Sequence, residues 1–310
     1  MYLGYLTSCL PTTPLEDKVK FAKEQGFKAL EVAVWPRENE RDYASSDIDV
    51  ANLTQEEADR IKKMMDDNGL EITSLAYYDN NLDVDPEKRA FYNEHTRRVI
   101  DAAEMLGVPT VGTFVGRNID KSLADNFDEF EEVFTELVGY AEEKGVKVII
   151  ENCPMFGWQK PNEPGALGFT PEQWHEMFRR VPNKNFGLNF DPSHLLLQHI
   201  DYLPLLEEFK DRIFHVHAKD AAVDMDMFHY YGVYNRILPD PDEHQFQNGY
   251  WRFNMPGLGQ VDWKAFFEAL KDIGYDGVVS IEHEDADYEG SEEKVFEGLA
   301  KGYEFLKELI

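Results

Sequence analysis

Short apolar runs rich in β-branched and aromatic residues alternate with longer amphipathic segments along the whole chain. Apolar runs of this length, bounded by turn residues, predict buried strands, and the 3.6-residue period of the longer segments predicts helices. The eight predicted strands are 2–7, 29–35, 71–78, 110–116, 147–153, 186–191, 213–218 and 277–284. The eight predicted helices are 15–27, 54–69, 86–107, 127–145, 170–181, 202–211, 262–274 and 292–309.

Several of the predicted helices carry start and stop signals. Residues that cap helix N-termini stand at the expected starts, and glycines stand at the expected ends. The starts are marked by Thr54, Asp85 and Thr170, and the ends by Gly26, Gly69, Gly107, Gly145 and Gly274. These signals support the alternation of strand and helix.

The strict alternation predicts the fold class. Repeated β-α-β units are right-handed and place their strands parallel in one sheet. Eight units in 310 residues fit a closed (β/α)8 TIM barrel better than an open doubly wound sheet. An open sheet would usually carry a glycine-rich phosphate loop after its first strand, and TSCLPTTPLED contains none. Because nothing resembles a linker, residues 1–310 are expected to form a single domain.

Three connections are unusually long, at 36–53, 154–169 and 221–261. They follow predicted strands 2, 5 and 7, so all three belong to the C-terminal face of the barrel, where barrel active sites are built. Loops of this length in a compact domain are usually lids or binding loops. The active site is therefore expected at this face.

The net charge indicates which partners are disfavoured, and the cysteines indicate the cellular compartment. The chain has 60 acidic and 31 basic residues, a formal net charge of -29. Such a surface repels phosphate backbones and anionic membranes, so neither nucleic acid nor membrane is expected as a partner. Cys9 and Cys153 form no CxxC motif, and no secretory leader or membrane-spanning run is visible. These features predict a cytoplasmic protein.

Acidic or imidazole side chains stand at the ends of four consecutive predicted strands. Glu151 ends VIIE, Asp191 ends FGLNFD, His217 lies in IFHVHA and Glu282 follows VVSI. Alternation along the strand puts His215 and His217 on one face, with His217 nearer the carboxyl end. An ionised carboxylate in such apolar surroundings needs hydrogen bonds, a counter-charge or a metal.

Each of these residues also has a structural alternative. A lone acid at a strand end often caps the next helix, and Asp191 could cap the turn through Pro192. His215 is expected to be a core histidine deeper in the barrel, and His283 to point toward the helix layer. Four independent accidents on adjacent strands are a poor explanation. Carboxylates with one imidazole and an open position predict one divalent ion, Mn²⁺ first, with Mg²⁺, Co²⁺ or Zn²⁺ as alternatives.

Five motifs together carry a resemblance to a known family. They are IIEN at 149–152, DPSH at 191–194, HAKD at 217–220, PGLGQVDW at 256–263 and IEHED at 281–285. The chain resembles, over essentially its full length, the xylose isomerase-like TIM-barrel superfamily, which includes D-tagatose and D-psicose 3-epimerases, inosose dehydratase and endonuclease IV. The resemblance implies that Glu151, Asp191, His217 and Glu282 hold the metal. It also implies that His194 contacts substrate hydroxyls.

The superfamily divides on features visible in the sequence. Endonuclease IV needs further histidines after strands 3 and 4, where this chain has AYYDN and GTFVG. Its acidic surface also disfavours a DNA-binding role. Xylose isomerase itself carries a different acid cluster. The sugar epimerase and isomerase branch remains.

The expected chemistry begins with loss of the proton α to the carbonyl of a ketose or 3-keto sugar. The resulting cis-enediolate would be stabilised by the metal as Lewis acid. Glu151 and Glu282 come from strands separated by two others, so they could flank the substrate and exchange acid and base roles. With a leaving group β to the carbonyl, the same site would be a lyase, a dehydratase or a 3-keto-glycoside (C-glycoside) deglycosidase subunit. A sugar-binding barrel without turnover is the third alternative.

The long 221–261 connection is rich in aromatic residues, most of which are expected to pack the loop down. Trp35 and Trp158 are expected to stack on the sugar, with Lys219 and Arg252 as polar contacts. Glu31 and Asp220 are further polar candidates. Because no phosphate cradle appears, the substrate is expected to be an uncharged sugar or glycoside. A homo-oligomer or a hetero-complex stays open.

Overall fold

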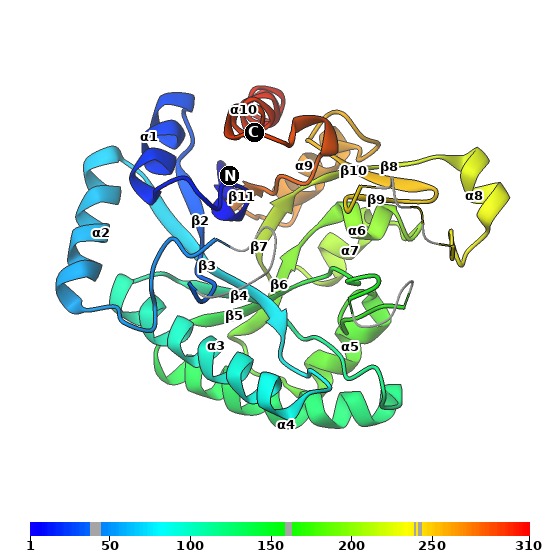
Figure 1. Cartoon of the computed structure of the whole chain (residues 1–310), viewed down its shortest axis with the longest axis horizontal. Helices are drawn as coiled ribbons and strands as arrows, with labels where there is room; N and C mark the ends of the chain where they lie inside the picture. Colours follow the sequence, from blue (N-terminus) through cyan, green and yellow to red (C-terminus); the bar gives the residue numbers. More distant parts are fainter. Residues whose placement is uncertain (38–44, 159–162, 239, 241–243) are drawn as a thin grey trace.

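The computed structural model describes residues 1–37, 45–158, 163–238, 240 and 244–310. Eight parallel strands close into a barrel in the order β1-β2-β3-β4-β5-β6-β7-β11, and β11 pairs with β1 (Figure 1). The strands are β1 (Tyr2–Leu6), β2 (Ala29–Ala33), β3 (Glu71–Asn80), β4 (Thr110–Phe114), β5 (Lys147–Glu151), β6 (Phe186–Phe190), β7 (Ile213–Ala218) and β11 (Val278–Ile281). The predicted (β/α)8 TIM barrel is confirmed.

Helices surround the barrel as an outer layer (Figure 1). They are α1 (Leu15–Gln25), α2 (Gln55–Asn68), α3 (Pro86–Leu106), α4 (Leu123–Glu143), α5 (Pro171–Arg180), α6 (Pro192–Leu196), α7 (Leu203–Glu208), α9 (Trp263–Asp272) and α10 (Glu292–Leu306). The side chains of Thr54, Asp85 and Thr170 accept hydrogen bonds from first-turn N–H groups, as predicted. Gly26 and Gly69 end α1 and α2 with positive φ, which glycine adopts without strain.

The connection after β7 is more ordered than the sequence indicated. It contains a second, antiparallel sheet in the order β8-β10-β9 and a short helix, α8 (Met225–Tyr231), which projects from the molecule (Figure 1). The strands are β8 (Asp220–Val223), β9 (Gln247–Asn248) and β10 (Trp251–Asn254). Residues 239 and 241–243 of this connection lie outside the described residues, as do 38–44 and 159–162 of the other two long loops.

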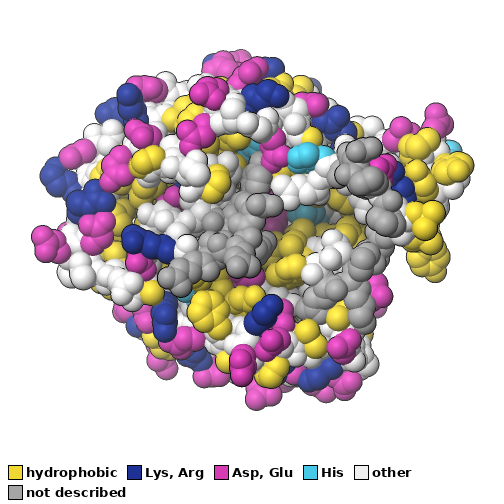
Figure 2. Space-filling view, viewed as in Figure 1, with side chains coloured by type: hydrophobic (Ala, Val, Ile, Leu, Met, Phe, Trp, Pro, Cys, Tyr) yellow, Lys and Arg dark blue, Asp and Glu magenta, His cyan; other side chains and the backbone are white. Residues whose placement is uncertain are grey.

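The surface combines acidic side chains with one apolar projection. Acidic residues are spread over the visible face, and the hydrophobic side chains at the right of Figure 2 belong to the region of α8. Exposed apolar residues here include Met225, Tyr230 and Tyr234. Among the described residues, none of the helices is both long and apolar enough to cross a membrane. Cys9 and Cys153 are both free thiols.

Candidate active site

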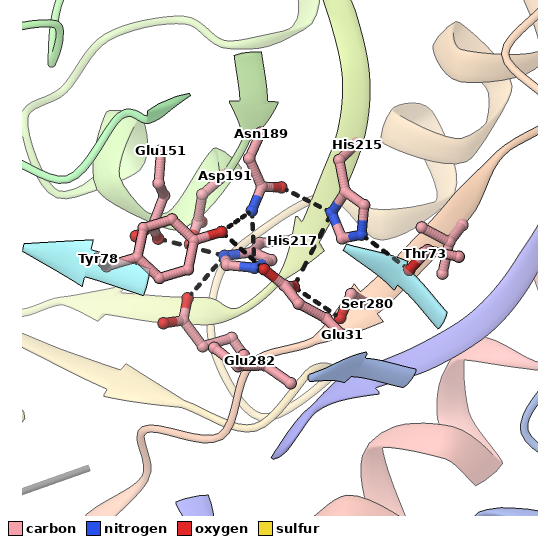
Figure 3. Close-up of polar contacts among 12 residues, drawn as sticks. Glu31, Thr73, Tyr78, Glu151, Asn189, Asp191, His215, His217, Ser280 and Glu282 are labelled. Carbon is pink, nitrogen blue, oxygen red and sulfur yellow. Dashed lines mark hydrogen bonds and ion pairs between the residues drawn. The ribbon is translucent and has the colours of Figure 1, made fainter. Parts of the chain in front are cut away.

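The carboxyl ends of β5, β6, β7 and β11 bring four side chains to one place (Figure 3). Glu151 is the last residue of β5, Asp191 precedes α6, His217 lies near the end of β7 and Glu282 follows β11. One ligand atom from each lies within 4.8 Å of those of the other three. Glu151, Asp191 and His217 are buried, and the Glu282 side chain is 12% exposed. We call these four residues the acid–histidine cluster.

The two carboxylate oxygens of Asp191 have different surroundings, which correspond to the two roles that the sequence presented as alternatives. Its Oδ1 accepts a hydrogen bond from Ser193 N at 2.7 Å and so caps α6. Its Oδ2 makes no hydrogen bond within the described part of the chain and lies 3.3 Å from the Nζ of Lys219. A buried carboxylate oxygen without hydrogen bonds, facing two further carboxylates and an imidazole, suits a divalent cation. The donor set therefore fits the expected ion.

Lys219 is buried, and its ammonium group lies among the carboxylates of the acid–histidine cluster. The residue is 1% exposed, and its Nζ lies 2.7 Å from Glu282 Oε2, 3.1 Å from Glu284 Oε2 and 3.5 Å from Glu151 Oε1. It also lies 4.8 Å from the centroid of the Phe253 ring. Burial alone would lower the pKa of Lys219, but the carboxylates raise it well above its usual value. The ammonium is therefore a permanent counter-charge.

The pKa values of the neighbouring carboxyl groups of Glu151 and Glu284 are shifted in opposite directions. Burial would raise the pKa of Glu151, but the Lys219 charge and the hydrogen bonds from His194 and His217 lower it well below its usual value. For Glu284, burial and the charge of Glu282 outweigh Lys219 and raise the pKa to about 7. Glu151 thus stays ionised, while Glu284 is near its titration point at neutral pH.

A cavity of about 390 Å³ opens beside the cluster. It is lined by Cys153, Pro154, Met155, Phe156, Gly157, Trp158, His194, Leu197, Gln245, Phe246, Trp251, Phe253 and Glu284. His194 links this cavity to the cluster, because its Nε2 lies 3.2 Å from Glu151 Oε1. The structure therefore places His194 and Trp158, both predicted to bind substrate, in the wall of one apolar cavity next to the predicted metal ligands.

Two predicted substrate contacts lie elsewhere. Trp35 is 3% exposed, and its Nε1 donates to Asp79 Oδ2 at 3.1 Å. Arg252 pairs with Asp285 and Asp287 and lines a separate cavity of about 570 Å³ beside α8. Neither belongs to the described residues that line the smaller cavity. Their roles toward substrate remain predictions.

The two histidines that were expected to be structural, His215 and His283, are both buried. His215 Nδ1 lies 3.0 Å from Asn189 Oδ1, and its Nε2 lies 3.2 Å from Thr73 Oγ1. His283 packs against α10, where its ring lies close to Gly298. Both residues are 1% exposed.

The sequence pattern predicted neither the polar network below the acid–histidine cluster nor the position of Glu284 beside it. The network joins Tyr78, Asn189 and Ser280 to Glu31, which is fully buried and not on the rim (Figure 3). A signal for Glu284 was present, since it is two residues from Glu282 in IEHED and shares its side of an extended segment. For Tyr78 and Asn189, the alternation of side chains along a strand predicts that they point into the barrel, but it does not predict their hydrogen-bond partners.

The barrel and its acid–histidine cluster can now be compared with known proteins. The family model described as xylose isomerase-like TIM barrel matches residues 19–309. The chain belongs to this family. Together with the inosose dehydratase relative described below, membership in this family supports an enzyme that modifies a small sugar.

Several known proteins match by sequence, among them the following two. The uncharacterized protein YfiH of Bacillus subtilis (strain 168) is 28% identical over 315 residues, which cover 92% of this chain and 93% of that protein. The inosose dehydratase of Lacticaseibacillus casei is 28% identical over 256 residues, 76% of each chain.

Many solved structures match by fold, among them the following two. D-psicose 3-epimerase with D-tagatose from Clostridium cellulolyticum H10 has a TM-score of 0.69 at 15% identity, covering 100% of this chain and 99% of that one. The IolI protein with a bound zinc atom has a TM-score of 0.70 at 19% identity, covering 100% and 99%. At these identities the likeness concerns the fold.

Proposed function

We propose that this chain is a divalent-metal-dependent epimerase or isomerase that acts on a ketose or 3-keto sugar. The observation that carries the proposal is the convergence of Glu151, Asp191, His217 and Glu282 beside an apolar cavity. Three carboxylates with one imidazole favour Mn²⁺ among the candidate ions. These four residues would hold the ion, which would act as a Lewis acid toward the substrate carbonyl.

The proposed acid–base pair is Glu151 and Glu282, which enter from strands separated by β6 and β7. One glutamate, when ionised, takes the proton from the carbon α to the carbonyl, and the electron pair moves to the carbonyl oxygen to give an enediolate. The other glutamate, when protonated, returns a proton to the opposite face and inverts that carbon. His194, next to Glu151 and in the cavity wall, would donate to a substrate hydroxyl.

Elimination is the second candidate, and a specific observation favours it. A sequence relative with a named activity, from Lacticaseibacillus casei, is an inosose dehydratase. If a hydroxyl or glycosyl oxygen stands β to the carbonyl, the enediolate electron pair can expel it. A protonated glutamate then gives its proton to the leaving oxygen. The same residues would therefore serve a lyase.

The cavity favours an uncharged substrate with an apolar face. Five of its lining residues carry a Phe or Trp ring: Phe156, Trp158, Phe246, Trp251 and Phe253. Such rings bury large apolar areas and can pack against the C–H face of a sugar ring. The volume of about 390 Å³ lies within the range of small-molecule sites, and we propose that it accepts a glycoside as well as a free sugar.

The test measures exchange of the α-proton with solvent. Protein reconstituted with Mn²⁺ is incubated in D₂O with a panel of ketoses and 3-keto glucosides, and the products are analysed by mass spectrometry. Deuterium in an epimer supports the first candidate, and a product lighter by one water supports the second.

The variant Glu282→Gln is expected to retain a folded barrel but to lose exchange by about 100-fold or more, because one proton carrier is missing. Glu297→Gln, on the exposed face of α10 and paired with Lys301, is the control and should exchange normally. Full exchange by Glu282→Gln with its Mn²⁺ bound would refute the role of Glu282. Failure of the wild type to bind Mn²⁺ would refute the proposed function.

A further inference from the structure

The imidazole of His217 lies between two sets of carboxylates. Its Nδ1 faces the cluster, 3.3 Å from Glu151 Oε1 and 3.0 Å from Glu282 Oε2. Its Nε2 points the other way and lies 2.8 Å from Glu31 Oε2 (Figure 3). Both Glu31 and His217 are 0% exposed. Glu31 is therefore the innermost acid of the site, with His217 between it and the predicted metal ligands.

Among the residues that the structure describes, the side chains in hydrogen-bond contact with Glu31 can each act as a donor. Tyr78 donates its hydroxyl to Oε1 at 2.7 Å, and Ser280 donates its hydroxyl to Oε2 at 3.2 Å. His215 comes no closer than 4.0 Å and uses its Nδ1 on Asn189. A carboxyl group surrounded by donors is kept as a carboxylate, which can only accept hydrogen bonds. The atom of His217 that contacts it must then carry a proton.

Asn189 is the competing partner for the same imidazole nitrogen. Its Nδ2 lies 2.8 Å from His217 Nε2 but also donates to the Tyr78 hydroxyl at 2.7 Å. Its Oδ1 faces the Nδ1 of His215. If Nε2 accepted from Asn189, its lone pair would face the Glu31 carboxylate at 2.8 Å, which is electrostatically unfavourable. The pair of Glu31 and His217 therefore decides the tautomer.

We propose that Glu31 is a positioning residue that keeps the proton of His217 on Nε2, so that the Nδ1 lone pair is directed at the divalent ion. A neutral imidazole has one N–H and one lone pair, so fixing the first fixes the second. A carboxylate behind a metal-bound histidine also makes the imidazole a stronger ligand. The inference rests on the proposed function, because it assumes that the acid–histidine cluster binds the ion.

The geometry also offers an opposite arrangement, which the experiment must separate. Ligand atoms of Glu31, His215 and His217 lie within 4.8 Å of one another and could hold a cation of their own. In that case the side of His217 facing Glu31 would be a ligand, and Glu31 would not be a positioning residue.

The experiment uses Zn²⁺ as a diamagnetic probe. Zn²⁺ affinity is measured by competition with a chelating dye in the wild type, Glu31→Gln and Thr73→Val. Glu31→Gln keeps the shape but removes the charge next to His217. Thr73→Val is the matched control, because Thr73 is buried in the same network but contacts His215 instead. We expect Glu31→Gln to bind Zn²⁺ about 10- to 100-fold more weakly and Thr73→Val to bind it as the wild type does.

The second readout needs only the wild type, so it does not depend on the folding of a variant. In ¹⁵N spectra of the histidine rings of Zn²⁺-loaded protein, His217 should carry its proton on Nε2 and coordinate through Nδ1. A proton on Nδ1, unchanged affinity in Glu31→Gln, or two Zn²⁺ per wild-type chain with one lost in Glu31→Gln would overturn the inference. A wild type that binds neither Zn²⁺ nor Mn²⁺ would overturn the proposed function itself.

Discussion

Lys219 allows several carboxylates to share one buried position. Its ammonium lies within 3.5 Å of Glu151, Asp191, Glu282 and Glu284. Removing ionised groups from water costs several kcal/mol each unless an opposite charge is near. A divalent ion at the same carboxylates would take over part of this role. When no metal is bound, Lys219 therefore stabilises the folded protein by balancing the charge of the carboxylates that are proposed to bind the ion.

We predict that Lys219→Met strongly destabilises the metal-free protein. The loss should be about 3–5 kcal/mol in the free energy of unfolding, because buried carboxylates are left without their cation. Urea unfolding in the presence of a chelator measures it, and added Mn²⁺ should restore part of the loss. Lys121→Met, which removes an exposed partner of Glu129, is the control and should cost less than about 1 kcal/mol. If Lys219→Met lost less than about 1 kcal/mol of unfolding free energy, Lys219 would not be the counter-charge of the buried carboxylates.

At the scale of elements, Asp220 joins the second sheet to the barrel. Its Oδ2 accepts from Gly257 N, Gly259 N and the Nε1 of Trp263, at 2.8–3.1 Å. Its Oδ1 accepts from Val261 N at 2.9 Å. A Cβ on Gly259 would lie 2.3 Å from Asp220 Oδ1, so the loop needs glycine there. The HAKD and PGLGQVDW motifs are thus two halves of one hydrogen-bonded structure.

We predict that Asp220→Asn loosens the 256–263 loop. The amide NH₂ group cannot accept from the N–H groups that Oδ2 now serves, so buried donors lose their acceptor. We expect a loss of about 3 kcal/mol in unfolding free energy, and faster hydrogen exchange at the amides of Gly257 and Gly259. Trp263→Phe removes one donor but keeps the carboxylate, so those amides should stay protected. Unchanged exchange in Asp220→Asn would contradict the prediction.

The contact of α3 with the end of β2 should depend on pH. His95 Nε2 lies 2.9 Å from Val34 O and donates to it, and burial lowers the pKa of His95. The folded protein therefore favours the neutral ring, while the unfolded chain takes up a proton near the ordinary pKa of about 6.5. This contribution to stability is present above that pH and is lost as the pH falls toward the lowered folded pKa.

The variant His95→Gln separates this effect from other titrations. Glutamine keeps an N–H donor for Val34 O but does not titrate in this range. The difference in unfolding free energy between wild type and variant should shrink as the pH falls from about 7.5 to about 5.5. A difference that is constant over this range would contradict the assignment.

For the whole molecule, the acidic excess is a source of internal repulsion. The formal charge is -29, and acidic side chains are scattered over the face shown in Figure 2. Like charges spread over a compact surface favour expansion of the chain. Surface ion pairs offset this only in part, because each contributes little.

We predict that salt stabilises this protein. Raising KCl from about 10 mM to about 200 mM shortens the screening distance from about 30 Å to below 10 Å, so repulsion between distant carboxylates falls. The melting temperature should rise at pH 7, and should rise less at a pH close to the pI of about 4.6. Sucrose in place of salt is the control for effects unrelated to charge. A fall in melting temperature with salt at pH 7 would show that attractive pairs dominate.

The sequence predicted the barrel and the residues at four strand ends, because both follow from local periodicity. It did not predict β8, which is separated from β7 by Lys219 alone and pairs with β10 about thirty residues later. It also did not place Glu31 below His217, since alternation tells which side chains point inward but not how deep each lies. The expectation of a single domain over residues 1–310 stays a prediction.

The network below the acid–histidine cluster has a consequence for how this barrel could be divided. Glu31 and Tyr78 belong to the first half of the chain, whereas Asn189, His217 and Ser280 belong to the second. A fragment that ended after β4 would retain the innermost acid without the imidazole that balances its charge. The other fragment would retain the imidazole without its acceptor. Each half-barrel alone would therefore leave a buried polar side chain of this network without its partner.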